Sequence, residues 1–268
     1  MKNFTAEKHI HHAFDQDLEQ LDAMVLEMCD LVASLLQDAV TAVTTIDQSL
    51  ARTVVERDRA IDELELKVEE LAVRILALRE PKGVDLRWVI AALESSSDLE
   101  RMGDMAKNIA KRVAILTHYT PVEGIADILP MSRLILDFLA KLRLAWAEKD
   151  SELALQTWTG DAEIDSLFDG MFHNLMMVMI QSPQHITPGT HLLFVAKNLE
   201  RIGDHITNVA EAIHYVETGH KLDGVRPRTD AHYRYHVPPA APSDADAEVT
   251  EEDVEKTESS GGRSGKEG

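Results

Sequence analysis

The chain carries the twelve-residue stretch LERMGDMAKNIA at residues 99–110 and a close copy, LERIGDHITNVA, at residues 199–210. Leucine, glutamate, arginine, glycine, aspartate, asparagine and the closing alanine recur at the same offsets in both copies. A repeat this close indicates a duplicated structural unit. The two halves of the chain are therefore expected to share one fold.

Both copies have the residue spacing of an α-helix. At about 100° per residue, Glu100, Asp104 and Asn108 fall on one side of the helix, while Met102 and Ile109 fall on the opposite, apolar side. We call each such row of polar residues an acidic ladder. The ladder of the second copy consists of Glu200, Asp204, Asn208 and Glu211.

The acidic ladders predict metal binding. Two carboxylates one helical turn apart repel each other by roughly a few tenths of a kcal/mol, so solubility alone does not favour them. Carboxylate and amide oxygens in this arrangement suit a divalent cation or an iron cluster, with Fe, Zn, Mn and Mg as candidates. The candidate ligands are Glu100, Asp104, Asn108, Glu200, Asp204, Asn208 and Glu211.

Two features of the ladders leave alternatives open. A solvated helix face would carry the same carboxylates, with Lys107 and Lys111 balancing the charge of the first copy. Gly103 and Gly203 occupy equivalent positions inside the predicted helices, where glycine costs about 1 kcal/mol relative to alanine. They indicate the close approach either of another helix or of a ligand.

Six long segments have helical spacing of apolar residues, at about 10–45, 50–78, 85–118, 125–148, 150–180 and 190–216. The predicted fold is all-α, with two tandem three-helix bundles of antiparallel helices. The predicted boundaries are a first repeat at residues 1–120, which opens on a loose arm over residues 1–8, and a second repeat at residues 121–221. Residues 222–268 are predicted to form an acidic, disordered tail because apolar periodicity stops there.

Composition narrows the functional class. The 268 residues carry a net charge of −20, which disfavours non-specific binding to nucleic acid. The single cysteine, Cys29, lies in an apolar helical stripe and is expected to be a core residue. No signal peptide and no run of about 18 apolar residues is visible, so a cytoplasmic protein is expected, reaching the membrane only through partners.

The duplicated Leu-Glu-Arg-(Met/Ile)-Gly-Asp phrase resembles the PhoU family of phosphate-signalling regulators over about residues 8–220, together with Lys8-His9-Ile10 and Asp85-Leu86-Arg87. The resemblance implies a pair of three-helix bundles and an acid-x-x-x-Asp pattern in each half. It also implies negative regulation of the phosphate-starvation response and of phosphate uptake. The implied partners are the ATPase subunit of the phosphate ABC transporter, the phosphate sensor histidine kinase and a second copy in a homodimer.

Other functional classes have less support from the residues. Glu211 and His214 form the Glu-x-x-His motif of ferritin-like di-iron bundles, but that fold needs the motif on two helices and it occurs once within a predicted helix. A purely structural helical scaffold without metal is the third class. No Gly-rich phosphate loop, Gly-x-Ser-x-Gly or His-Glu-x-x-His motif is present, so no enzymatic activity is expected.

Overall fold

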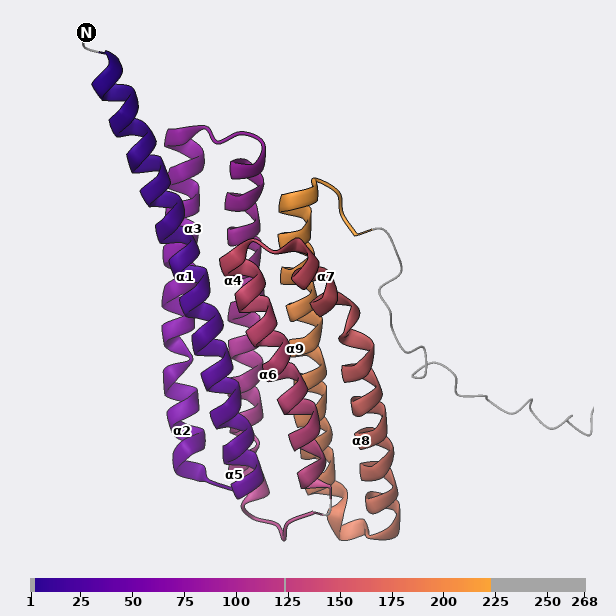
Figure 1. Ribbon diagram of the computed structural model, residues 1–268. Helices are drawn as coiled ribbons and strands as arrows, with labels where there is room; N and C mark the ends of the chain where they lie inside the picture. The colour runs from indigo at the N-terminus through magenta and orange to yellow at the C-terminus, as the bar shows by residue number, and fades with distance from the viewer. Residues whose placement is uncertain (1–2, 123, 223–268) are drawn as a thin grey trace, which may run out of the picture. The chain divides into compact units, whose positions relative to one another are not determined.

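The computed structural model describes residues 3–122 and 124–222, and all of these residues fall in one compact unit (Figure 1). The described part is helical and contains no strand, which confirms the predicted all-α class. Apart from Leu222, the predicted tail lies outside the described residues. The helical elements are α1 (Asn3–Thr45), α2 (Gln48–Arg57), α3 (Arg59–Arg79), α4 (Val84–Lys111), α5 (Val113–Leu116), η1 (Ile125–Asp127), α6 (Ile128–Glu148), α7 (Ser151–Thr159), α8 (Asp161–Gln181), η2 (Pro183–His185) and α9 (Ile186–Thr218).

The second helix of each repeat is interrupted where the sequence predicted a continuous one. The first interruption lies at Asp58, between α2 and α3, and the second at Gly160, between α7 and α8. Both residues keep right-handed helical dihedral angles, so the break is local. The predicted loose arm also differs, because α1 begins at Asn3.

The turn between the first two helices of each repeat shows the duplication in backbone detail. Asp47 begins α2 by accepting hydrogen bonds from the backbone N–H groups of Ser49 and Leu50, and Asp150 begins α7 in the same way. Such N-caps satisfy donors that a helix leaves free at its start. The residue before each cap is left-handed, with φ of 56° at Ile46 and 54° at Lys149.

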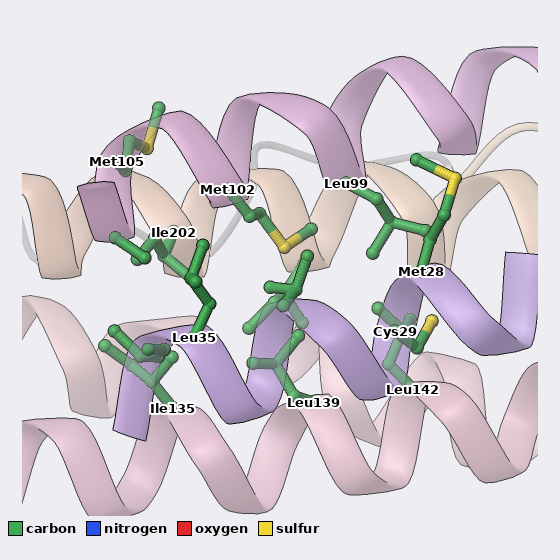
Figure 2. Close-up of a cluster of buried hydrophobic side chains, with 14 of the residues drawn as sticks. Met28, Cys29, Leu35, Leu99, Met102, Met105, Ile135, Leu139, Leu142 and Ile202 are labelled. Carbon is green, nitrogen blue, oxygen red and sulfur yellow. The ribbon is translucent and has the colours of Figure 1, made fainter. Parts of the chain in front are cut away.

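The hydrophobic core extends across both repeats. Helices α1 and α4 of the first repeat pack against α6 and α9 of the second, and their buried side chains interdigitate (Figure 2). The rings of Trp88 on α4 and Trp146 on α6 lie 4.6 Å apart between centroids. Among the described helices, none is long and apolar enough to cross a membrane. The labelled core residues are Met28, Cys29, Leu35, Leu99, Met102, Met105, Ile135, Leu139, Leu142 and Ile202.

A shared core predicts that the two repeats unfold together. Leu139 on α6 is 1% exposed, so Leu139→Ala should lower the free energy of unfolding by about 2–5 kcal/mol through lost contacts and a cavity. Leu144 on the same helix is 45% exposed, and Leu144→Ala should change it by less than about 0.5 kcal/mol. Urea titration followed by circular dichroism should show one transition for both variants. Two separate transitions, with only one of them shifted by Leu139→Ala, would contradict the shared core.

Candidate functional site

The two glycines of the repeated phrase lie at helix crossings. A Cβ atom built on Gly103 would lie 2.8 Å from Cδ1 of Ile61 and 3.1 Å from Oδ1 of Asp58. A Cβ atom built on Gly203 would lie 2.8 Å from Cδ1 of Ile164 and 3.5 Å from Oδ1 of Asp161. Of the two alternatives that the sequence left open, the structure therefore shows close approach of a helix at both glycines.

This crossing brings a second set of carboxylates to the first ladder. Asp58 at the break between α2 and α3 lies beside Gly103 and is 2% exposed, and Asp62 and Glu65 follow it on α3. Burial raises the pKa of Glu100, and the nearby charges of Asp104, Glu65, Asp62 and Asp58 raise it further. The first acidic cluster therefore comprises Asp58, Asp62, Glu65, Glu100 and Asp104.

The second acidic cluster forms at the equivalent crossing of α8 and α9. Asp161 lies beside Gly203 and is 2% exposed, and Asp165 follows one turn later on α8 and is 9% exposed. Sequence reasoning missed these residues and their counterparts in the first repeat. The available signal was the pattern D-x-x-I-D-x-L, which occurs at residues 58–64 and again at residues 161–167. By equivalence with the first, we define the second acidic cluster as Asp161, Asp165, Glu200 and Asp204.

Lys107 lies inside the first cluster. Its ammonium nitrogen pairs with Oδ2 of Asp58 and with Oδ1 of Asp104, and so joins the α2–α3 break to α4. Burial lowers the pKa of Lys107, but hydrogen bonds to Asp104 and Asp58 and their charges outweigh this effect and raise it overall. The first ladder is therefore not a freely solvated face, because its charge is balanced by a largely buried lysine.

The second cluster has a different set of neighbours. Thr207 stands at the position equivalent to Lys107, and its hydroxyl donates to the backbone carbonyl oxygen of Asp204 at 2.7 Å. The ammonium nitrogen of Lys197 lies 2.7 Å from Oε2 of Glu200, one turn earlier on α9. The lysines that pair with the ladder carboxylates therefore stand at different positions in the two repeats.

The remaining candidate ligands lie elsewhere on the two helices. Asn108 is half-buried on α4. Asn208 and Glu211 line a cleft of about 710 Å³ between α4 and α9, where the amide of Asn208 donates to Oδ1 of Asp98 at 3.1 Å. Nδ1 of His205 lies 2.6 Å from the same oxygen. The predicted ladder of the second copy is therefore divided between the acidic cluster and the α4–α9 cleft.

The donor chemistry of the clusters suits a hard cation, since it consists of carboxylate oxygens from two helices. Within residues 3–122 and 124–222, no three His, Cys, Asp or Glu side chains converge closely enough to hold a metal ion as they stand. The carboxylates would have to turn toward a bound ion. In the first cluster an ammonium group already lies between two of them.

Two copies of a three-helix unit, with an acidic cluster at the same crossing in each, define a class of duplicated helical-bundle proteins. The family model described as "PhoU domain" matches residues 25–113 and residues 128–213, one match in each half. The chain therefore belongs to the PhoU family.

Relatives support this assignment over nearly their whole length. The chain is 41% identical over 224 residues to the phosphate-specific transport system accessory protein PhoU homolog of Caulobacter vibrioides, which covers 83% of this chain and 97% of that protein. The homolog of Zymomonas mobilis is 39% identical over 222 residues, covering 83% and 94%. The crystal structure of PhoU from Pseudomonas aeruginosa superimposes with a TM-score of 0.74 at 32% identity, covering 77% of this chain and 100% of that one.

Neutralising Glu100 should stabilise the fold near neutral pH. Because the pKa of Glu100 is raised in the folded state, its ionised form disfavours folding. Glu100→Gln should therefore be more stable than the parent chain at pH 7. Its advantage should shrink as pH falls through the raised pKa and vanish below the ordinary value of 4.5.

Urea unfolding at pH 7 and at pH 4 measures this difference. The exposed Glu63 on α3 provides a control, because Glu63→Gln removes the same charge outside the crossing. An equal gain from both variants at pH 7 would point to general surface charge rather than to the cluster.

Proposed function

We propose that this chain is a regulatory accessory protein of a phosphate-specific transport system. The observation that carries the proposal is the match of 41% identity over 97% of a relative named for that role, with both repeats included. A solved relative from Streptococcus pneumoniae with a TM-score of 0.74 is described as a phosphate transport system regulatory protein. The proposed role is that of an adaptor without enzymatic activity.

The proposed partners are the ATPase subunit of the phosphate ABC transporter and the phosphate sensor histidine kinase. Through them the protein would act at the cytoplasmic side of the membrane, as a homodimer, to restrain phosphate uptake and repress the phosphate-starvation response. Rigid helices with exposed acidic side chains suit docking to basic patches on such partners. Co-purification with membranes made with and without the transporter tests this part.

We further propose that the acidic clusters bind a divalent metal ion or an iron cluster. The support is that each cluster combines carboxylates from two helices at a crossing held by a glycine. Such oxygen donors favour Mg²⁺, Mn²⁺ or iron over soft cations. In this chain Glu100 and Asp104 of the first ladder, and Glu200 and Asp204 of the second, would each hold an ion, which would supply positive charge between the helices.

Loss of metal should follow when the carboxylates of both ladders are neutralised. The double variant Asp104→Asn and Asp204→Asn keeps the side-chain shapes and removes one charge from each cluster. Bound metal, measured by elemental analysis after mild purification, should fall sharply while the helical circular-dichroism signal is kept. Unchanged metal content in the folded variant would show that these carboxylates are not ligands.

The regulatory role of the clusters can be separated from folding. A variant in which all four ladder carboxylates are neutralised should melt no lower than the parent chain, because relief of the like-charge repulsion at i and i+4 offsets the lost ion pairs of Lys107 with Asp104 and of Lys197 with Glu200. In a deletion strain it should fail to silence a phosphate-starvation reporter in high phosphate. The variant is Glu100→Gln, Asp104→Asn, Glu200→Gln, Asp204→Asn.

The matched control removes four charges from exposed positions outside the ladders. It should silence the reporter as the parent chain does. Full repression by the folded, metal-free ladder variant would rule out a role for the ladders. Normal repression in the strain that lacks the protein altogether would rule out the regulatory proposal itself. The control variant is Glu63→Gln, Glu70→Gln, Glu152→Gln, Glu163→Gln.

A further inference from the structure

A cleft of about 710 Å³ lies between α4 and α9, where the two repeats meet. Arg87 contacts Val216 at one end of this helix pair and Asp98 contacts His205 further along. The two helices therefore run antiparallel beside the cleft (Figure 1). A cleft of this volume can enclose a short peptide segment, and the residues along it define what that segment must carry.

The charged side chains of the cleft are ordered along its length. Arg87 and Lys221 lie at the end where α9 stops, which we call the mouth of the cleft. Glu94 and Glu211 lie about two helical turns further in. Within residues 3–122 and 124–222, neither glutamate has an ion pair or a side-chain hydrogen bond. A matching occupant carries an acid near the mouth and basic groups deeper inside.

Apolar side chains form the wall between these charges. They are Leu86 and Ile90 on α4 and Ala212 and Tyr215 on α9. Ile90 is 39% exposed, although it lies next to the core helices. Removing such surface from water favours binding in proportion to the area covered. The matching occupant therefore combines apolar side chains with its cations.

The chain leaves α9 on the side of the cleft. Gly219 follows the last helical residue with a left-handed φ of 70°, and its backbone N–H donates to the carbonyl oxygen of Tyr215 at 2.8 Å. Two residues later Lys221 lines the cleft, and Leu222, where the described part of the chain ends, is half-buried. Whatever follows Leu222 is therefore tethered at the mouth of the cleft.

The sequence after Leu222 matches the cleft in the same order. Residues 223–229 read Asp-Gly-Val-Arg-Pro-Arg-Thr, with an acid first and two arginines after it. Asp-Gly favours a reversal of chain direction. From Gly224, about 3.3 Å per extended residue carries the chain roughly 7 Å to Arg226 and 13 Å to Arg228. Glu211 lies a comparable distance, about 10 Å, before the end of α9.

From this order of charge, wall and tether we infer that residues 223–229 of the chain dock in the α4–α9 cleft. The two arginines of the segment pair with Glu211 and Glu94, its valine and proline cover the apolar wall, and its aspartate lies beside Lys221. The chain thereby supplies the occupant of its own cleft and closes the joint between the repeats. This contact is independent of metal binding and of the proposed partners.

The tether makes these weak contacts effective. An exposed arginine–carboxylate pair alone contributes little to stability, although its bidentate geometry is specific. A segment attached at the mouth of the cleft binds at a high effective concentration and loses little translational freedom. The fixed φ of Pro227 further lowers the entropy that docking costs. A basic segment of another protein lacks the tether, so the chain's own segment is the favoured occupant.

Disulfide trapping in the full chain tests the contact. The double variant Ala212→Cys and Val225→Cys joins the wall of the cleft to the segment, and diamide should oxidise the two thiols rapidly within one chain. The rate should not depend on protein concentration, and it should fall at least about tenfold in about 1 M NaCl, which screens the ion pairs. The natural Cys29 should not compete, because it is 2% exposed and burial raises its pKa to about 12.

A second cysteine pair provides the control. Glu217 is exposed and lies about 140° round α9 from Ala212, on a side that does not line the cleft. It is also nearer to Val225 in the chain, so simple loop closure favours the pair Glu217→Cys and Val225→Cys. Trapping should nevertheless be faster at Ala212. Equal or faster trapping at Glu217 would overturn the docking.

Charge reversal identifies the partners. Arg226→Glu with Arg228→Glu, added to the Ala212–Val225 cysteine pair, should slow trapping at least about tenfold through repulsion from the cleft. Adding Glu94→Arg and Glu211→Arg should restore it. A rate that these four substitutions leave unchanged would overturn the docking. Disulfides formed mainly between two chains would also overturn it and assign the cleft to a second copy.

Trypsin digestion of the chain without added cysteines keeps the test decisive if those variants fold poorly. Cleavage after Arg228 should be several-fold slower in the parent chain than in a variant with Glu94→Gln and Glu211→Gln. Cleavage after Arg263 should be equal in the two chains. Equal cleavage after Arg228 would overturn the docking, while the metal analysis and the reporter assay would still decide the proposed function.

Discussion

The packing of α4 against α9 is the contact on which the rest of the structure depends. Both helices turn their apolar residues toward a common core, where Met102 and Ile202 are fully buried. Polar contacts fix the same pair at the edges: Asp98 on α4 meets His205 and Asn208 on α9, and Nε of Arg87 donates to the backbone oxygen of Val216 at 3.0 Å. The two repeats are therefore joined through their duplicated helices rather than linked as separate bundles.

The apolar faces of α4 and α9 pack into the core. The opposite face of each is covered by the preceding long helix of the same repeat, which is α3 for α4 and α8 for α9. Glycine at 103 and 203 permits the close approach, which encloses Asp58 and Asp161, each 2% exposed, against the helix that carries the ladder. Enclosed carboxylates are costly unless a cation pairs with them. In the first repeat the ammonium group of Lys107 supplies that positive charge to Asp58.

The two repeats place different side chains at the equivalent positions 107 and 207. Lys107 pairs with Asp58 and Asp104, whereas the hydroxyl of Thr207 donates to the backbone oxygen of Asp204 and Lys197 pairs with Glu200.

The sequence by itself determined the duplication, the all-α class and the family, because these depend on residue order and on periodicities of about 3.6 residues within a helix. It also placed Glu100, Asp104, Glu200 and Asp204 opposite the apolar stripe of their helices. Only the tertiary structure decided what covers that face. Asp58 lies more than forty positions before Asp104 in the chain, so helical spacing could not relate the two.

Helical spacing was also unable to show which neighbouring helix the other ladder residues meet. Asn208 and Glu211 share a helix side with Asp204 by angle, but they lie further along the axis of α9, at about 1.5 Å per residue. There they line the cleft between α4 and α9. The lysine that the sequence offered as a counter-charge for a solvated face proved to be a largely buried link between two helices. A sequence fixes the direction of a side chain on its own helix, whereas its partner depends on which helix packs there.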